Sequence, residues 1–153
     1  MKSGGYFHKL LEVNLSNGEI KKTAIPEADI KNYIGGRGLG TKILWDRIPH
    51  PGQDPFSPEN PLLFMPGPFS GFPIPSSSRT CVVTKSPRTS PVKPEYEHAS
   101  TVSYSNIGGF WGPELRFAGY DGLLVTGKAD KPVYLKIDDD KVEIKDASKY
   151  WGM

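Results

Sequence analysis

The sequence is poor in the residues that build covalent or metal-bound frameworks. Its 153 residues include one cysteine and three histidines. A single cysteine excludes an internal disulfide and any all-cysteine metal or cluster site within the chain. His8, His50 and His98 share no ligand-like spacing with one another or with acidic residues, so we expect no histidine metal site. Cys81 lies in a β-branched run and is interpreted as a small core residue.

Net charge and long apolar runs are also lacking. Lys and Arg total 19 against 17 for Asp and Glu, so the formal charge is +2, and the basic residues are scattered. This balance gives no indication of nucleic-acid binding. No apolar run approaches the roughly 20 residues of a membrane span, and the N-terminus has no signal-peptide core. We therefore expect a cytoplasmic protein that binds neither nucleic acid nor a membrane.

Glycine and proline are abundant by contrast, with 17 and 15 residues respectively. They gather in short stretches between segments of clear periodicity, at 35–40, 49–61, 66–75 and 87–94. Loops held between rigid elements are common places for binding sites. The length and the 37% hydrophobic content fit one globular domain over residues 1–153.

Hairpin and helix signals mix along the chain and predict an α+β fold, with antiparallel hairpins and short strands packed with about three helices. Alternating patterns predict strands at 10–15, 19–24, 62–65, 81–84, 123–126, 132–137 and 141–144. Helices are predicted from Pro26 to the glycines at 35–36, over 39–48 and over 109–117. Residues 89–104 are predicted to be a long functional or mobile loop.

Several aromatic and aliphatic side chains are expected in the core. They are Ile30, Tyr33 and Ile34 on the first helix, Leu39, Ile43, Leu44 and Trp45 on the second, and Phe110 and Trp111 at the start of the third. For the last three, a core position is favoured over a stacking platform for a ligand.

Two loops are rich in hydrogen-bond donors and suit a large, flat, anionic ligand. Arg79 follows three serines and precedes a strand, where a guanidinium can bind phosphate in a bidentate manner. An ordinary surface arginine is the alternative. Asn106 precedes Gly108 and Gly109, where the backbone allows close approach of a ligand. The alternative there is an asparagine cap with glycines that serve the turn.

The Gly35-Gly36-Arg37-Gly38-Leu39-Gly40 stretch is not a nucleotide-binding motif. It follows a predicted helix, lacks Lys-Ser/Thr, and does not have the spacing of a dinucleotide fingerprint. A tight helix–helix corner is the better interpretation, and Arg37 remains able to support a ligand.

Taken in order, these fragments resemble the N-terminal domain of the tungsten- or molybdenum-pterin aldehyde ferredoxin oxidoreductase family. The matching features are the first hairpin, the glycine-rich corner, the stretch 62–71 with its Gly-Pro, Ser77-Ser78-Arg79, Lys85-Ser86-Pro87, the stretch 108–121 that ends in Phe-Ala-Gly-Tyr-Asp, and the late hairpin up to Trp151-Gly152. Each fragment is weak alone, but their order and spacing together are specific.

The resemblance implies three cofactor-binding residues, Arg79, Asn106 and Gly108, at a bis-pterin that carries tungsten or molybdenum. It also implies that Asn106 helps to hold a magnesium ion that bridges the pterin phosphates. The family's 4Fe-4S cysteines, second set of pterin loops and proton-transferring residues lie farther along and match nothing here. No catalytic residue is therefore assigned, and an incomplete pterin-binding domain of a longer enzyme is expected.

The whole enzyme implied by the resemblance oxidises aldehydes to carboxylates and passes electrons to ferredoxin. Expected partners are the remainder of the enzyme or a partner subunit, with ferredoxin for the whole enzyme, and a homo-oligomer is compatible with the sequence. Two alternatives stay open. One is a non-catalytic pterin-binding or assembly subunit, and the other is part of a benzoyl-CoA-reductase-like catalytic subunit, which the Gly-Gly-Phe-Trp helix resembles.

Overall fold

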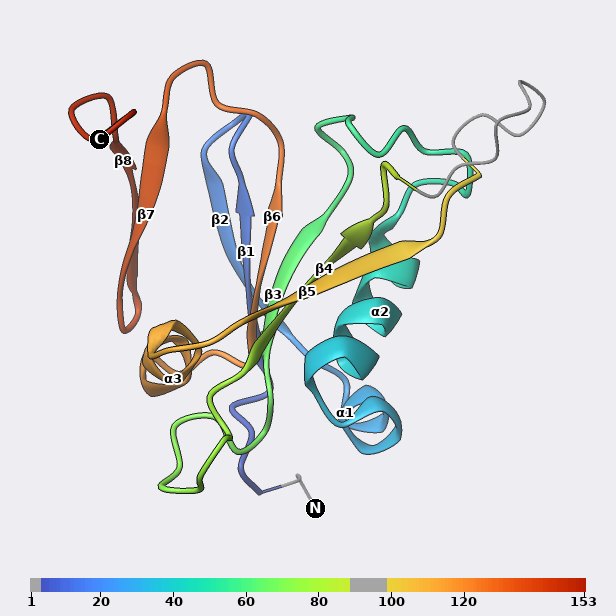
Figure 1. Cartoon of the computed structure of the whole chain (residues 1–153), viewed down its shortest axis with the longest axis vertical. Coiled ribbons are helices and arrows are strands. Elements are labelled where there is room, and N and C mark those ends of the chain that lie inside the picture. Colours follow the sequence, from blue (N-terminus) through green and yellow to red (C-terminus); the bar gives the residue numbers. More distant parts are fainter. Residues whose placement is uncertain (1–3, 89–98) are drawn as a thin grey trace.

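The computed structural model describes residues 4–88 and 99–153, and these build a mixed sheet covered on both faces (Figure 1). In chain order the elements are β1 (Lys9–Asn14), β2 (Glu19–Ala24), α1 (Glu27–Tyr33), α2 (Gly36–Arg47), β3 (Leu62–Pro66), β4 (Thr80–Lys85), β5 (Val102–Ile107), α3 (Trp111–Phe117), β6 (Gly122–Thr126), β7 (Val133–Asp138) and β8 (Lys141–Asp146). Six strands form one sheet in the order β2-β1-β6-β3-β4-β5, and β7 pairs with β8. The predicted α+β class is confirmed.

Strand pairing follows the sequence closely at both hairpins. β1 and β2 are antiparallel around the predicted Ser16-Asn17-Gly18 turn, with Asn14 opposite Glu19. The later hairpin turns between Asp138 and Lys141. The parallel pairing of β1 with β6 joins the first hairpin to a strand from the later part of the chain, so the hairpin becomes part of the main sheet.

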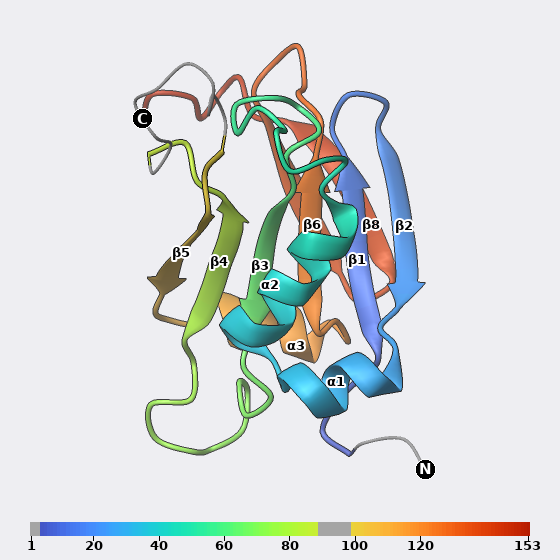
Figure 2. The same cartoon turned by 90° about the vertical axis from the view of Figure 1, so that its right-hand side faces the viewer.

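Helices α1 and α2 cover one face of the sheet (Figure 2). The core beneath them contains Leu10, Ile25, Ile30, Leu39, Ile43, Leu44, Leu63, Met65, Cys81, Val83 and Leu124. Gly40 allows α2 to approach closely, because a Cβ there would lie 2.9 Å from Val83 Cγ2 and 3.0 Å from Met65 Cγ. The glycine-rich stretch is therefore a packing corner between α1 and α2, in agreement with the sequence interpretation.

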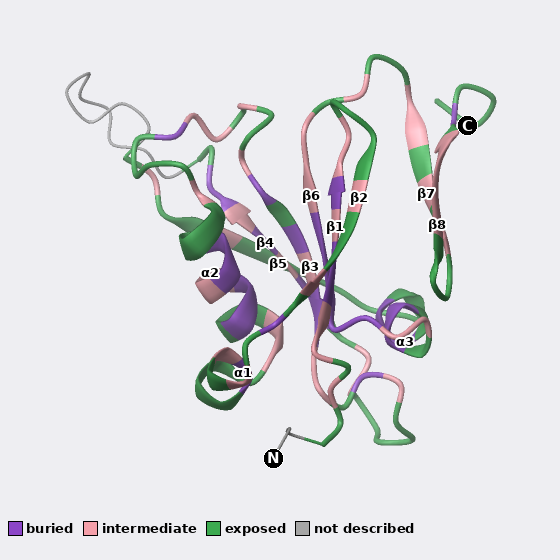
Figure 3. Cartoon of the chain, turned by 180° about the vertical axis from the view of Figure 1, so that it is seen from behind, coloured by how far each residue is buried: buried purple, intermediate pink, exposed green. Residues whose placement is uncertain are grey.

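Helix α3 and the β7–β8 hairpin cover the opposite face. A second buried cluster lies there, formed by Leu11, Val13, Leu115, Tyr120 and Leu123, with apolar side chains of the hairpin packed against it. Figure 3 shows that burial concentrates along the central strands and on the side of α2 that faces the sheet. The open end of the sheet beyond β4 is much more exposed, because β5 is an edge strand.

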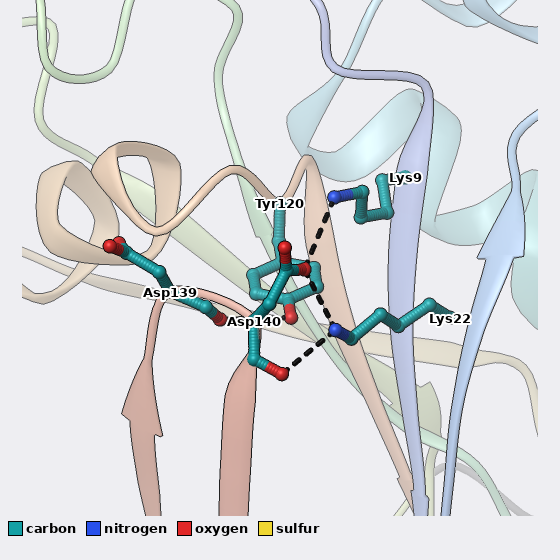
Figure 4. A network of polar contacts seen from close by, with 5 residues as sticks. All are labelled: Lys9, Lys22, Tyr120, Asp139 and Asp140. Carbon is teal, nitrogen blue, oxygen red and sulfur yellow. Dashed lines mark hydrogen bonds and ion pairs between the residues drawn. The ribbon is translucent and has the colours of Figure 1, made fainter.

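The tip of the β7–β8 hairpin is fastened to the sheet by polar contacts (Figure 4). The buried Tyr120 hydroxyl donates a hydrogen bond to the Asp139 carbonyl at 3.0 Å. Lys22 Nζ donates to the Asp140 carbonyl at 2.8 Å and to its carboxylate at 2.7 Å. Lys9 Nζ lies 3.6 Å from the same carboxylate. We call these five residues the hairpin latch.

A buried ion pair gives the Phe-Ala-Gly-Tyr-Asp segment a structural role, so no chemical role needs to be assigned to it. Arg116 pairs with Asp121, and Arg116 also donates to the Gly5 carbonyl. The Asp121 carboxylate accepts backbone N–H groups from Phe7 at 3.2 Å and from Lys9 at 3.1 Å. The two charges are therefore paired, while Arg116 Nε has no partner among the described residues, and the pair holds the N-terminal segment against the end of α3.

Some burial predictions were wrong. Tyr33 and Ile34 are 40% and 60% exposed, and Trp45 is 78% exposed. Only one stripe of each helix meets the sheet, and α2 places Leu39, Ile43 and Leu44 in that stripe, so Trp45 points away from it. Of the predicted 89–104 loop, residues 89–98 lie outside the described part, and its last three residues belong to β5.

Within residues 4–88 and 99–153, α2 is the longest helix at 12 residues. No helix in those ranges has the length and apolar character that crossing a membrane would require.

Candidate functional site

Arg79 lies immediately before β4, at the end of a loop that leaves β3 after Pro66. Its side chain is exposed. No hydrogen bond or ion pair joins that guanidinium to another residue within 4–88 or 99–153. Because an unpaired guanidinium at a strand mouth keeps all its donors available, the position suits an anionic ligand.

Asn106 lies in β5 rather than in the predicted loop before α3. It pairs with Cys81 of β4, while its neighbour Ile107 pairs with Thr80. The strand was missed because all but one of its residues are exposed and the remaining one is half-buried, so it lacks the apolar alternation of a covered strand. Thr101 and Val102 mark its start, and a β-branched pair there was the available signal.

The register of β4 and β5 brings the predicted site residues to the same end of the sheet. Thr80 is opposite Ile107, so the preceding residue, Arg79, comes next to Gly108. Neighbouring strands lie about 5 Å apart in the hydrogen-bonding direction. Arg79 and Asn106 therefore converge through the direct pairing of β4 with β5.

The Gly108–Gly109 turn is open above its backbone. A Cβ at either position would meet no atom of another residue within 4 Å. Gly109 has a φ of +84°, a left-handed conformation that favours glycine. Gly108 has no such constraint, so its missing side chain leaves free space next to Asn106 and Arg79.

The start of α3 is locked against the same end of β4. A Cβ on Gly112 would overlap Thr80 Oγ1 and would lie 3.3 Å from Ser70 Oγ. Thr80 and Ser70 are each 1% exposed, and within the described ranges neither hydroxyl has a hydrogen-bond partner. The contact between Thr80 and Gly112 fixes the 108–110 turn relative to Arg79, because the turn comes just before Gly112 and Arg79 comes just before Thr80.

Two aromatic side chains beside the turn face outward, contrary to the core assignment. Phe110 is 81% exposed, and Trp111 is 39% exposed. Trp111 still rests on Phe64, with ring centroids 5.2 Å apart and planes inclined by 49°. These side chains are surfaces for contact rather than core, since α3 is short and buries only its opposite side.

Arg37 was left as a possible support for a ligand, and Tyr104 was placed in the predicted loop. The Arg37 guanidinium carbon lies 4.4 Å from the centroid of the Tyr104 ring. Tyr104 and Asn106 are two residues apart on β5, so they point to the same face of the sheet. The alternation of Val102, Tyr104 and Asn106 could have revealed this, had β5 been recognised as a strand.

The donor set fits an anionic ligand better than a metal held by the chain alone. Among the described residues, no group of three or more His, Cys, Asp or Glu side chains is placed to hold a metal ion. Guanidinium groups, one amide and an open glycine backbone instead suit phosphate and a flat heterocycle. The residues present therefore fit a pterin with phosphate groups, which the resemblance implies.

Comparison with known proteins identifies the family. The profile of the aldehyde ferredoxin oxidoreductase N-terminal domain matches residues 10–153. The tungsten-containing aldehyde ferredoxin oxidoreductase of Pyrococcus horikoshii is 46% identical over 148 residues, which cover 97% of this chain and 23% of that protein. The "aliphatic sulfonate oxidoreductase, WOR-like subunit" of Pyrococcus furiosus is 42% identical over 150 residues, covering 97% and 22%.

A solved structure shares both sequence and fold. It is the active-site complex BamBC of benzoyl coenzyme A reductase with 1,5-dienoyl-CoA, one chain of which matches with a TM-score of 0.85 and 44% identity. The match covers 97% of this chain and 21% of the other.

The fold and the matched residues define the class of aldehyde ferredoxin oxidoreductase N-terminal domains. This chain belongs to the aldehyde ferredoxin oxidoreductase family. It spans about a quarter of the length of the curated relatives that it matches.

Proposed function

We propose that this chain forms the first part of the base that binds a metal–pterin cofactor in a larger oxidoreductase. The observation that carries the proposal is the β4–β5 register, which sets Arg79 beside Gly108 and two register positions from Asn106, on the same face of the strand pair. Arg79 immediately precedes β4, whereas Asn106 lies in β5 and Gly108 follows that strand, a long stretch of sequence away. The three residues meet at an exposed edge of the sheet where no described carboxylate neutralises Arg79, and an anionic cofactor requires a positive site of this kind.

Each residue has a separate role in this proposal. Arg79 binds a phosphate or the polar edge of the pterin, and Gly108 lets the ligand approach the main chain. The amide oxygen of Asn106 is a hard ligand of the kind that magnesium prefers, and it would help to hold an ion between two phosphates. When bound, the cofactor supplies tungsten- or molybdenum-based two-electron redox chemistry, and the residues of this chain bind and orient it.

The reaction that we propose for the whole enzyme is the oxidation of an aldehyde to a carboxylate. An aldehyde and water give the carboxylic acid, two protons and two electrons, and ferredoxin accepts the electrons through a 4Fe-4S cluster in the remainder of the enzyme. The names of the curated relatives support this reaction. The partners would be that remainder or a partner subunit, and a homo-oligomer is compatible with it.

A second candidate is part of a benzoyl-CoA-reductase-like catalytic subunit. The match to a BamBC chain at 44% identity supports it as well as the relatives support aldehyde oxidation. A third candidate, a non-catalytic pterin-binding or assembly subunit, shares the same cofactor site and differs in lacking turnover.

The test uses the complete protein that contains this chain, purified without oxygen. Tungsten, molybdenum and pterin are measured per polypeptide, and viologen reduction is followed with aldehydes and, separately, viologen oxidation with benzoyl-CoA. Aldehyde-dependent reduction supports the leading proposal, benzoyl-CoA-dependent oxidation supports the second, and bound pterin without turnover supports the third. A folded protein that contains neither pterin nor metal would refute all three.

Arg79→Ala tests the site itself, with Arg88→Ala as the matched control beyond the other end of β4. Arg79→Ala should leave the free energy of unfolding unchanged within roughly 0.5 kcal/mol, as for an exposed side chain. It should lower the metal and pterin content because a charge-assisted contact is lost. If Arg79→Ala unfolds the protein while metal content per folded enzyme stays constant, Arg79 is structural.

A further inference from the structure

Arg37 is a second guanidinium at the same end of the sheet, contributed by the glycine-rich corner. It lies in the first turn of α2, and its side chain is exposed. Its ring contact with Tyr104, at 4.4 Å, ties α2 to the edge strand β5. The contact places the glycine-rich corner next to the edge strand β5. The strand order alone does not require this proximity.

The direction of these side chains follows from the strand register. Val83 touches Gly40 of α2, and Tyr104 is the register partner of Val83. Tyr104 therefore faces α2, and Asn106, two residues on, faces the same way. Arg37 and Asn106 consequently share one side of the β4–β5 pair.

Neither guanidinium is neutralised within the protein as far as it is described. Among residues 4–88 and 99–153, no carboxylate forms an ion pair with Arg37 or with Arg79. Two other arginines do have carboxylate partners: Arg47 pairs with Glu12, and Arg116 pairs with Asp121. Two uncompensated guanidinium groups at one edge repel each other unless an anion lies between or beside them.

We propose that Arg37 binds a phosphate group of the cofactor as a second cationic contact, and that stacking on Tyr104 holds its guanidinium in place. This inference rests on the proposed function, because it assigns a further residue to the same cofactor site. Stacking restricts the side chain before the ligand arrives, so less conformational entropy is lost when it binds.

The experiment measures cofactor retention in the complete enzyme. Arg37→Ala, Arg37→Lys, Tyr104→Phe and Tyr104→Leu are compared with Arg47→Ala, which removes an arginine from the other end of the same helix. Each loaded enzyme is dialysed at low and at high salt, and pterin and metal per polypeptide are followed over time together with the melting temperature.

We expect Arg37→Ala to lose pterin roughly 10-fold faster than the unaltered enzyme, which corresponds to one charged hydrogen bond. Arg37→Lys should lose it at an intermediate rate, because the charge remains but the planar fork does not. Tyr104→Phe keeps the ring and should match the unaltered enzyme, whereas Tyr104→Leu should lose pterin faster. High salt should narrow these differences, and Arg47→Ala should show none.

Four outcomes would overturn the inference. Equal retention in Arg37→Ala, with faster loss in Arg79→Ala, would refute it while the proposed function stands. A lower melting temperature with unchanged pterin per folded Arg37→Lys enzyme would make the stacked pair purely structural. If inorganic phosphate raises the melting temperature through Arg37 while pterin retention is unaffected, the ligand is free phosphate rather than the cofactor. Absence of pterin from the unaltered enzyme would refute both proposals together.

Discussion

Gly108 and Gly109 are adjacent and equally open, yet they are glycines for different reasons. Both have free space where a Cβ would lie, but only Gly109 has the left-handed φ of +84°. An alanine at Gly109 strains the backbone, and an alanine at Gly108 only fills space. The two substitutions therefore separate a turn requirement from a ligand requirement.

Gly108→Ala should leave the melting temperature unchanged and lower the pterin content of the complete enzyme, since its methyl group would occupy the ligand's approach. Gly109→Ala is the matched comparison and should cost about 1 kcal/mol of stability, because a Cβ is disfavoured at that φ. Thermal unfolding and pterin content measured on both variants check this. Full pterin content in Gly108→Ala would show that no ligand approaches that backbone.

The aromatic residues near the site could not be assigned from sequence composition. Phe110-Trp111 has the apolar character of a core pair, but α3 is only seven residues long and buries Gly112, Pro113, Leu115 and Arg116 instead. A sequence pattern indicates which face of a helix is apolar only when the helix has enough turns to define one. Truncation of Trp111 should accordingly cost less than a core aromatic substitution.

Among the elements, α2 depends on one close approach to the sheet. Gly40 faces Val83 and Met65 at distances that leave no room for a methyl group. A tight contact of this kind fixes where the first turn of α2, and with it Arg37, lies relative to β5. The position of Arg37 in the candidate site therefore depends on how Gly40, one turn farther along α2, packs against the sheet.

Gly40→Ala should destabilise the protein by about 1–3 kcal/mol through overpacking. Gly67→Ala is the control, because a Cβ there meets nothing within 4 Å and its φ is not positive. Chemical unfolding of both variants measures the difference. Equal stability would mean that Val83 and Met65 move aside without cost.

The hairpin latch should respond to acid. Its Asp140 carboxylate has a pKa below the ordinary value, chiefly because Lys22 donates a hydrogen bond to it. A carboxyl group with a lowered folded-state pKa contributes stability above its unfolded pKa, near 4, and this contribution disappears as the pH falls through the folded value. At the other limit, the raised pKa of Lys22 means that its contribution is lost only in strong alkali, above about pH 10.5.

Asp140→Asn should therefore lower the melting temperature near neutral pH and have no effect once the pH lies below the lowered pKa of Asp140 in the folded protein, where the carboxyl group is protonated. Melting curves of the two proteins across that pH range give the comparison, with Asp130→Asn as an exposed control that has no described ion pair. A difference that persists at the lowest pH would show that the latch does not act through this charge.

Elements with a strong local signal were predicted well. The Ser16-Asn17-Gly18 turn and the apolar alternation on both sides of it fixed the first hairpin, and Pro26 marked the region where α1 begins. β5 was missed because pairing with β4, rather than its own side chains, makes it a strand. The site residues were found as two donor-rich loops, but the part played by Tyr104 depends on a register that the sequence does not encode locally.

At the scale of the whole molecule, the chain covers about a quarter of its curated relatives. Several large apolar side chains are exposed by 60% or more, namely Ile34, Trp45, Phe56, Phe69, Phe110, Phe117, Tyr150, Trp151 and Met153. These exposed side chains are available for contacts with further protein.

The separately expressed chain should therefore show no aldehyde-dependent viologen reduction, even when it is folded. It has one cysteine and cannot by itself ligate a 4Fe-4S cluster, which takes four thiolates. The assay uses purified chain with added aldehyde and viologen, and the complete enzyme serves as the positive control. Turnover by the chain alone would show that redox chemistry does not need the rest of the enzyme.

The parallel pairing of β1 with β6 has a consequence for synthesis on the ribosome. Lys9 and Asp121, which flank this pairing and are joined by a hydrogen bond, lie 112 positions apart. At ordinary elongation rates, β6 emerges roughly 6 to 20 seconds after β1. During that interval the first hairpin has only its own two strands, which are marginally stable in water. Substitutions in β6 should consequently reduce the yield of soluble nascent chains more than equally destabilising ones in β7 or β8, because β6 ends the exposure of the hairpin's apolar faces.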